Sequence, residues 1–187
     1  MIPELLKDSE DHMKKSVEAA RHEFEGIRTG RANPALLDDV KVEAYGSMLP
    51  VNQVAAISVP EPRQLLITPY DRAQIAAIEK AILKSEVNIT PNSDGNSIRL
   101  TIPPLNEERR KEMGKLVGKK AEEGKAAIRN IRQNALKKLQ TQKKDKENPI
   151  SENDEKRAAD QVQKLVDKYI AEIEHLTKAK EAALMEV

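Results

Sequence analysis

Three stretches of this chain carry apolar residues mostly at steps of three and four, the spacing that places side chains on one face of an α-helix. They span residues 6–27, 113–139 and 162–176. An amphipathic helix is not stable while its apolar face is exposed to water, and three such faces are most simply buried against one another. The sequence therefore predicts an elongated bundle of three helices.

The first stripe ends in a segment that breaks a helix. Gly30 can take the left-handed conformation that follows a helix end, and Pro34 blocks a resumed helix. Beyond this point the period changes to the alternation and β-branched composition that are typical of short strands. The predicted strands are residues 40–44, 51–59 and 65–68, with a turn at residues 45–47.

One helix is expected among the strands. Asp71, followed three residues later by Gln74, has the pattern of a capping box ahead of an apolar run, which predicts a helix of about a dozen residues. A turn signal at residues 92–95 separates two further predicted strands, 87–89 and 98–102. The middle of the chain is therefore predicted to be a compact β/α/β unit.

Two proline-containing breaks delimit the remaining helices. Pro103 and Pro104 end the middle unit, and Asn106 is a suitable N-cap for a long second helix. The pair at residues 148–149, Asn-Pro, ends that helix, and Ser151 is placed to cap the third. The second helix contains three glycines, each of which costs about 1 kcal/mol relative to alanine in a helix interior. They are Gly114, Gly118 and Gly124.

The predicted fold class is α+β, with two domains. Residues 1–29 and 106–187 form a discontinuous three-helix bundle, and residues 31–104 form an inserted β/α/β domain. The chain passes between the domains twice, near residues 29–31 and near residues 103–106. Two short crossings permit hinge motion but resist free tumbling of one domain against the other, so we expect a hinge there.

The composition limits the class of protein and its compartment. The chain contains no cysteine, which excludes disulfides and thiolate chemistry and is typical of a reducing compartment. No segment approaches the roughly 20 apolar residues that span a bilayer, and the N-terminus shows no signal sequence. We therefore expect a cytoplasmic protein without a membrane partner. A net charge of +1 argues against a generally basic nucleic-acid binder, although charge can still be segregated on one face.

Segregated charge is present on the second predicted helix. From residue 125 to residue 144 all charged side chains are basic. At about 100° per residue, several of them lie within ~40° of a common line, roughly 80° from the centre of the apolar stripe. They are therefore expected to flank the core and face outward. We call this set the cation row: Lys111, Lys125, Arg129, Arg132 and Lys143, with Arg110 nearer the apolar edge.

Two interpretations fit the spacing of the cation row about equally well. One is a solvated helix face, which is what most runs of charge are. The other is a surface that follows phosphates, in which Arg129 and Arg132 matter most because a guanidinium can pair with phosphate through two hydrogen bonds. With one Phe, three Tyr and no Trp, base stacking on aromatic side chains is not expected. RNA bound here would be structured and recognised through its backbone and shape.

Catalysis has little support in the sequence. His12, His22 and His175 lie beside charged residues on predicted surface helices, with no partner at metal-ligand spacing and no nucleophile nearby. No glycine-rich phosphate loop follows a strand. We therefore expect no enzymatic activity, no metal site and no cofactor.

Four separated segments, in order along the chain, resemble motifs of the ribosome recycling factor family. The resemblance runs the whole length; residues 140–151 and the three glycines fit it least well. Any one motif alone is weak, but four in the right order on the same interrupted-bundle plan are specific. The segments are Ile27-Arg28-Thr29-Gly30-Arg31-Ala32-Asn33-Pro34, then Pro91-Asn92-Ser93 with Gly95 and Ile98-Arg99, then Pro103-Pro104-Leu105-Asn106-Glu107-Glu108-Arg109-Arg110-Lys111, and finally Arg129-Asn130-Ile131-Arg132.

The resemblance implies a translation factor with an L-shaped, hinged fold. Such a factor binds the ribosomal A site after termination and, with elongation factor G, splits the post-termination complex into subunits. It acts through binding and hinge motion, and GTP is used by elongation factor G rather than by this chain. The implied partners are the ribosome, chiefly its large-subunit RNA, and elongation factor G, and the implied state is a monomer.

The resemblance also assigns residues. Arg110, Arg129 and Arg132 match family positions that contact large-subunit ribosomal RNA, in agreement with the cation row, and we add Lys111 and Lys125 from that row to the expected RNA-binding set. The expected hinge residues lie at the two crossings of the chain. They are Arg28, Thr29, Gly30 and Arg31 at the first, and Pro103, Pro104 and Leu105 at the second.

Two other classes of protein remain open at the level of sequence. A coiled-coil interaction protein explains the helices and charges, and it predicts stable self-association without salt-sensitive affinity for RNA. A helical factor that stores idle ribosomes shares the cation row, but it stabilises joined subunits instead of separating them.

Overall fold

The computed structural model describes residues 1–186, which divide into two compact units. One unit contains residues 1–27 and 112–186, and the other contains residues 28–111. The second point of division lies inside a continuous helix, α4, which spans Glu107–Lys143. None of the helices in this range is long and apolar enough to cross a membrane.

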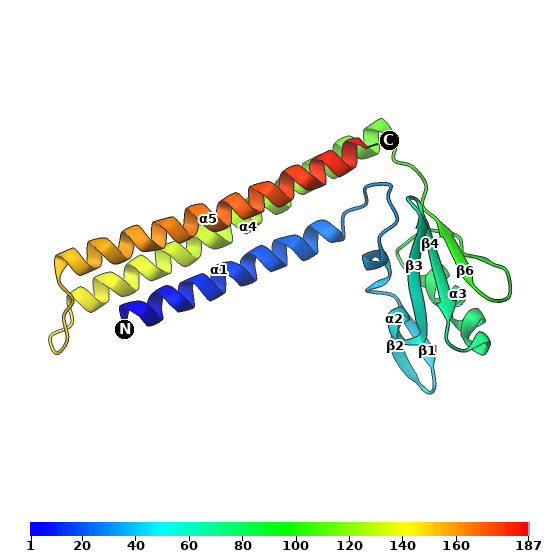
Figure 1. The fold of residues 1–187 in the computed structure, drawn as a ribbon, viewed down its shortest axis with the longest axis horizontal. Helices are drawn as coiled ribbons and strands as arrows, with labels where there is room; N and C mark the ends of the chain where they lie inside the picture. The colour runs from blue at the N-terminus through cyan, green and yellow to red at the C-terminus, as the bar shows by residue number, and fades with distance from the viewer. Residues whose placement is uncertain (187) are drawn as a thin grey trace. The chain divides into compact units, whose positions relative to one another are not determined.

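The first unit is a bundle of three long helices, as the apolar stripes predict (Figure 1). α1 and α5 run in the same direction, and α4 runs antiparallel to both. The short connection between α4 and α5 explains why these two helices are antiparallel. The helices are α1 (Ile2–Glu25), α4 (Glu107–Lys143) and α5 (Glu152–Met185).

Side-chain caps set the starts of α4 and α5 where the sequence predicts them. The backbone N–H of Arg109 donates to Oδ1 of Asn106 at 2.7 Å. The backbone N–H of Asp154 donates to Oγ of Ser151 at 3.0 Å. Each cap satisfies one of the N–H groups that a helix leaves unpaired in its first turn. Both predicted N-caps are confirmed.

Most of the buried residues of the bundle lie on the predicted stripes. Leu165 and Leu176 of the third stripe are only partly buried, and two buried positions that the stripe omitted, Ala158 and Val166, lie on the same face of α5. Many of the buried side chains are small, which lets the helix backbones approach closely. The core contains Met13, Val17, Ala20 and Phe24 of α1, Val117, Ala121, Ile128, Ala135 and Leu139 of α4, and Ala158, Val162, Val166, Tyr169, Ile173 and Leu184 of α5.

Gly124 of α4 lies where the three helices meet. A Cβ atom at this position would be 3.1 Å from Cδ1 of Ile173 on α5 and 3.4 Å from Cβ of Ala20 on α1. A Cβ at Gly118, six residues earlier on the same helix, would meet nothing within 4 Å. Close packing therefore explains Gly124, while Gly118 has no packing reason to be glycine.

The second unit contains two antiparallel sheets. The smaller is a hairpin of β1 and β2, closed by the turn Tyr45-Gly46, in which both residues have positive φ. The larger has four strands in the order β3-β4-β6-β5. In chain order, the elements of this second unit are η1 (Pro34–Leu37), β1 (Lys41–Ala44), β2 (Ser47–Pro50), α2 (Val51–Val54), β3 (Ala55–Glu61), β4 (Gln64–Pro69), η2 (Arg72–Gln74), α3 (Ile75–Lys84), β5 (Asn92–Ser93) and β6 (Ile98–Thr101).

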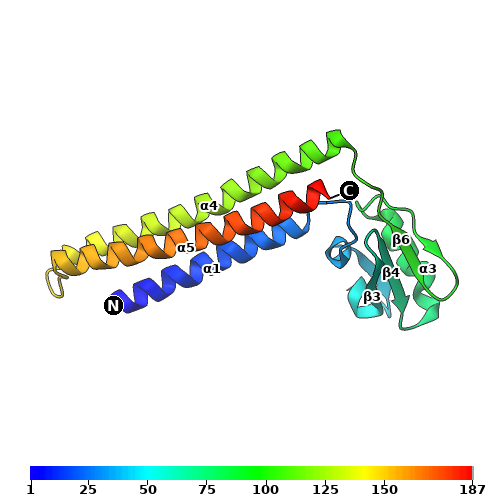
Figure 2. The same cartoon turned by 45° about the horizontal axis from the view of Figure 1, so that its top comes forward.

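One face of the four-stranded sheet forms the core of this unit. Leu65 of β4 pairs with Leu100 of β6, and two residues along Ile67 pairs with Ile98, so all four side chains are on the same face and fully buried. α3 lies on this side of the sheet (Figure 2), and its Ile78 and Ile82 belong to the same core cluster. The period-2 alternation of the sequence is therefore explained by a sheet that is covered on one face.

Two predicted strands are wrong in part or in whole. Residues 51–54 of the predicted strand 51–59 form a helical turn, because Val51 and Val54, three residues apart, are buried together on one side of it. The predicted strand 87–89 is absent. Asn88 has a φ of 54°, which breaks an extended chain, although Ile89 is buried in the core.

The predicted turn at residues 92–95 is displaced along the chain. Asn92 and Ser93 pair with β6 as the short edge strand β5, and the reversal follows them. Asp94 closes it by accepting the backbone N–H groups of Asn96 and Ser97, each at 2.9 Å. The carboxylate of an Asx turn thus defines the loop, with Gly95 at a φ of 89°.

The surroundings of Gly118 and Gly124 predict that substitutions at these two positions change stability in opposite directions. Gly118→Ala should raise the free energy of unfolding by about 0.5–1 kcal/mol, because alanine is the better helix former and its methyl group meets no neighbour. Gly124→Val should lower it by about 1–3 kcal/mol, because the added carbons crowd Ile173 and Ala20. Urea denaturation monitored by circular dichroism measures both. Equal effects of the two substitutions would contradict the packing explanation of Gly124.

A hydrogen bond joins α1 to α5 within the bundle. The hydroxyl of Tyr169, which is 2% exposed, donates to Oε1 of Glu10 at 2.7 Å. This bond, with smaller contributions from the ammonium groups of Lys14 and Lys168, holds the pKa of Glu10 below its usual value of 4.5. Burial, followed by the bond to Glu10, raises the pKa of the Tyr169 hydroxyl. The ionised carboxylate is therefore favoured in the folded state.

Tyr169→Phe should lower the free energy of unfolding at pH 7 by about 1 kcal/mol, since the hydroxyl is lost. Because the folded pKa of Glu10 is depressed, its stabilising contribution is present above about pH 4.5 and is lost as the pH falls further. The difference between wild type and variant should therefore shrink below pH 4.5. Urea denaturation at pH 7 and at pH 3 tests this, and a difference that does not change with pH would rule out the Glu10 explanation.

Candidate nucleic-acid interface

The cation row lies on one helix, α4, and its members differ in how accessible they are. Lys111 and Arg129 are exposed, whereas Lys125 and Arg132 are partly buried, and Arg110 is partly buried near the start of the helix. Within the described part of the chain, Arg110 takes part in no ion pair. The other members all have polar partners, and these partners decide which cations are available to an anion.

Lys125 does not face outward as predicted. Its side chain is only 17% exposed, and Nζ lies 3.7 Å from Oε1 of Glu122 on α4 and 3.4 Å from Oε1 of Glu174 on α5. Helix α5 packs on the side of α4 where Lys125 projects, and the lysine is compensated by two acids. The expectation that Lys125 is an outward-facing cation is therefore wrong.

Arg129 is the most accessible arginine of the cation row. Its side chain is 49% exposed, and its guanidinium Nη1 lies 3.8 Å from Oε2 of Glu122, seven residues earlier on α4. Seven residues are close to two full turns of an α-helix, so both side chains are on one face. The pair is long and solvated, which makes it weak.

Arg132 has a neutral partner. Its Nη1 donates to Oε1 of Gln163 on α5 at 3.4 Å, and the amide nitrogen of Gln163 donates to Oδ1 of Asp167 at 2.9 Å. The Asp167 carboxylate thereby orients the Gln163 amide so that its oxygen faces Arg132. The guanidinium keeps its full charge and most of its five N–H donors for another acceptor.

The two ends of the cation row are paired with acids. Lys143 lies 2.7 Å from Oε2 of Glu155 on α5, and that contact raises the pKa of the lysine. Lys111 is 3.6 Å from Glu107 one turn earlier, with both side chains well exposed. The cations of the row without a close acidic partner in the described chain are therefore Arg110, Arg129 and Arg132, and of these Arg129 and Arg132 belong to the bundle unit.

Four partner residues were missed by the sequence reasoning. Glu122 had a local signal, because it lies three residues before Lys125, just outside the acid-free run of residues 125–144. Gln163, Glu174 and Glu155 are on α5, and nothing in the sequence fixes how α5 is rotated against α4. Only the packed bundle identifies these three.

The expected hinge residues lie in two segments of the second unit that run close together. A Cβ atom on Gly30, which has a φ of 81°, would be 3.5 Å from the backbone nitrogen of Leu105 and 3.9 Å from Cα of Pro104. The left-handed conformation favours glycine here, whereas the distances to Leu105 and Pro104 are those of an ordinary contact. Thr29 accepts the backbone N–H of Arg31 through Oγ1 at 3.4 Å, and Arg28, which like Thr29 is partly buried, precedes them.

Both segments are anchored on the same hairpin loop between β3 and β4. The N–H of Ala32 donates to the carbonyl of Pro62 at 2.7 Å, and the N–H of Ile102 donates to the carbonyl of Arg63 at 2.7 Å. Pro103, which follows Ile102, is exposed. The chain is thus fixed to the sheet at Ala32 and Ile102.

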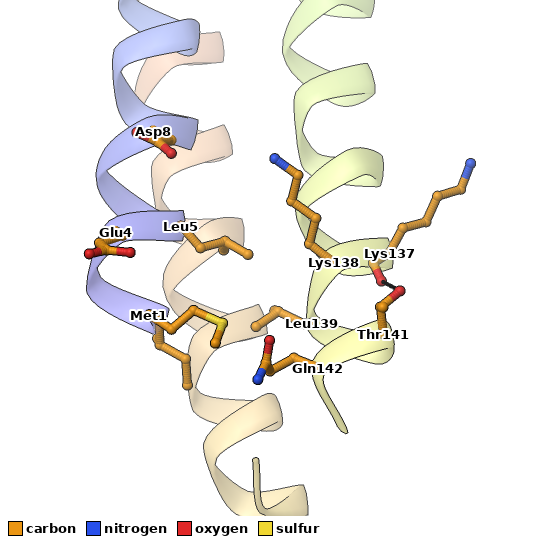
Figure 3. A pocket seen from close by; sticks show the side chains of 10 residues that line it. Met1, Glu4, Leu5, Asp8, Lys137, Lys138, Leu139, Thr141 and Gln142 are labelled. Atoms are coloured by element: carbon orange, nitrogen blue, oxygen red, sulfur yellow. Dashed lines mark hydrogen bonds between the residues drawn. The ribbon is translucent and has the colours of Figure 1, made fainter. Parts of the chain in front are cut away.

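A groove lies between the N-terminal part of α1 and the C-terminal part of α4 (Figure 3). It has a volume of about 410 Å³, and the side chains of Met1, Leu5 and Leu139 point into it, while Lys137 points away. The polar groups of its lining do not form an acid–base pair or a nucleophilic site.

A metal-binding cluster is not found among residues 1–186. No group of three or more His, Asp or Glu side chains in that range is placed to hold a metal ion. His12, His22 and His175 are all exposed, as expected for solvated histidines.

Comparison with known proteins gives a consistent result over the whole chain. A family model described as ribosome recycling factor matches residues 20–185. Two curated relatives named ribosome-recycling factor, from Symbiobacterium thermophilum and Carboxydothermus hydrogenoformans, are 54% and 52% identical, and each alignment covers both chains completely.

Two solved structures are similar in fold and sequence. A solution structure of the ribosome recycling factor is 44% identical, with a TM-score of 0.80 over 100% of this chain and 98% of that one. A second structure, with 43% identity, a TM-score of 0.70 and complete coverage of both chains, is described as models for the T. thermophilus ribosome recycling factor and the E. coli elongation factor G bound to the E. coli post-termination complex.

Proposed function

This chain belongs to the ribosome recycling factor family, and we propose that it splits the post-termination ribosome into subunits together with elongation factor G and GTP. The single observation behind this proposal is the full-length similarity to proteins named for that function, among them a solved structure described as models for a ribosome recycling factor and an elongation factor G bound to the post-termination complex. The binding place is the ribosomal A site, and the factor works in the cytoplasm as a monomer.

The proposed contact with large-subunit RNA is the arginine part of α4. Arg129 and Arg132 present guanidinium groups on one flank of the helix, where one has a weak acidic partner and the other a neutral one. Planar guanidinium forks suit the phosphates of structured RNA, and the described chain offers no aromatic platform beside them. Arg110 and Lys111 extend this contact toward the start of α4, while Lys125 positions Glu122 and Glu174 rather than meeting RNA itself.

The chain supplies binding and motion, not chemistry. Elongation factor G binds and hydrolyses GTP, and no cofactor is needed on this chain. The proposed hinge consists of two segments of chain. One joins α1 to the anchored residue Ala32, and the other joins the anchored residue Ile102 to α4. A push on the inserted domain is thereby converted into strain between the subunits.

Light scattering during subunit separation tests the function directly. Purified protein is mixed with post-termination ribosomes, elongation factor G and GTP, and each component is omitted in turn. Splitting that requires all components supports the proposal. Binding without splitting would favour a ribosome-storage factor, and self-association without binding to ribosomes would favour a coiled-coil interaction protein.

Arg132→Glu should weaken binding to the ribosome about tenfold or more and lower the slope of log affinity against log salt by about one, because one phosphate contact is lost. The free energy of unfolding should change by less than about 0.5 kcal/mol, since the one polar contact of Arg132 within residues 1–186 is a long hydrogen bond to an exposed glutamine. Arg157→Glu on α5 makes the same change of charge elsewhere and serves as the control. A large loss of stability would instead make Arg132 structural.

Thr29→Pro should leave ribosome binding intact and slow splitting, because the ring restricts the backbone of residues 28 and 29 at the first crossing. Proline at Gly30 is unsuitable, since its φ of 81° is closed to proline. Thr29→Ala, which removes the contact to the N–H of Arg31 without restricting the backbone, is the matched control. Normal splitting by a correctly folded Thr29→Pro variant would exclude a hinge at this crossing.

A further inference from the structure

Glu122 is an acid placed inside the cation row. Its carboxylate reaches two of the cations, with Oε2 at 3.8 Å from Nη1 of Arg129 and Oε1 at 3.7 Å from Nζ of Lys125. The side chain is 66% exposed, so it is not required to fill the core. An exposed acid beside Arg129, which belongs to the proposed RNA-binding surface, opposes the attraction of that surface for phosphate.

The two cations depend on Glu122 to different degrees. Lys125 has a second carboxylate, Glu174 of α5, at 3.4 Å, so it remains paired without Glu122. Arg129 has no other ion pair within residues 1–186. Removal of the Glu122 charge would therefore release Arg129 while leaving the contact between α4 and α5 through Lys125 in place.

A phosphate that binds Arg129 competes with this carboxylate. Both anions would lie beside the same guanidinium, and like charges at that separation repel each other. Because the pair is long and solvated, the carboxylate can swing away at a small cost, which corresponds to about 1.5- to 5-fold in affinity for an exposed pair. The effect is large enough to change a dissociation rate without abolishing binding.

We propose that Glu122 is a displaceable counter-ion that limits the affinity of the α4 surface for ribosomal RNA and so speeds release of the factor. The inference rests on the proposed function, since it names a control on the same RNA-binding surface. Glu122 acts through Arg129 and is a positioning residue rather than an RNA contact. A recycling factor must leave before the next round, and differences in affinity within one interface are expressed mainly in the dissociation rate.

Glu122→Gln tests the proposal, with Glu123→Gln as a matched control. The control removes one acid from the adjacent position, but Glu123 pairs with Lys120 at 3.4 Å on another side of α4, where Glu23 also holds that lysine. The two variants therefore have the same net charge, and only one of them alters the surroundings of Arg129.

Glu122→Gln is expected to bind ribosomes about 2- to 5-fold more tightly, to dissociate more slowly and to steepen the salt slope by up to about 0.9. When this variant is present at a lower concentration than the ribosomes, its later rounds of splitting should be slower than its first round. Glu123→Gln should match the wild type in all of these. If both variants bind more tightly by the same factor, the cause is the change in net charge, and the proposal is overturned. An unchanged or weaker affinity of Glu122→Gln would also overturn it.

The Arg129→Gln background separates this inference from the proposed function. If Glu122 acts on Arg129, then Glu122→Gln should have no effect once Arg129 is neutral. A persistent effect in that background would overturn the counter-ion role. If Arg129→Gln and Arg132→Glu both bind like the wild type, the RNA surface itself is wrong; if they bind weakly while Glu122→Gln is neutral, only the counter-ion is wrong.

Discussion

Mutual burial of three apolar helix faces is the constraint on which the rest of this protein depends. Each of the helices α1, α4 and α5 has an apolar face that must be covered for the helix to be stable. The three faces meet around Gly124, Ile173 and Ala20. Because the chain inserts a complete sheet-containing unit between α1 and α4, the bundle holds together segments that are distant in sequence. The same packing fixes the rotation of α4, and with it the direction in which each cation points.

The partners supplied by α5 sort the cations of α4 into two kinds. Lys125 and Lys143 are held by Glu174 and Glu155 and contribute to helix contacts. Arg129 and Arg132 keep charge that is available to an anion. A row that is uniform in sequence is therefore uneven in three dimensions, and the proposed RNA contact depends on two arginines rather than on the total charge of the row. This is how a chain of net charge +1 can present a surface for RNA.

Much of the fold could be predicted because its strongest signals are periodic. The three stripes, the caps at Asn106 and Ser151 and the alternation of β4 and β6 follow from local rules. Residues 51–54 and 87–89 could not be assigned correctly, since short apolar runs fit a helical turn, a strand or a buried loop equally well, and tertiary packing decides. In the candidate site, the sequence predicted the positions of the arginines on one side of the second helix. It could not predict the pairing of Lys125, because Glu174 comes from another helix.

The most direct test of this account is a cryo-electron microscopy map of the protein on a post-termination ribosome. The account predicts that Arg129 and Arg132 lie against the backbone of large-subunit RNA, with guanidinium nitrogens about 3 Å from phosphate oxygens. Glu122 should be turned away from Arg129 in that state. A map in which this flank of α4 faces solvent, while another surface of the bundle contacts the RNA, would contradict it.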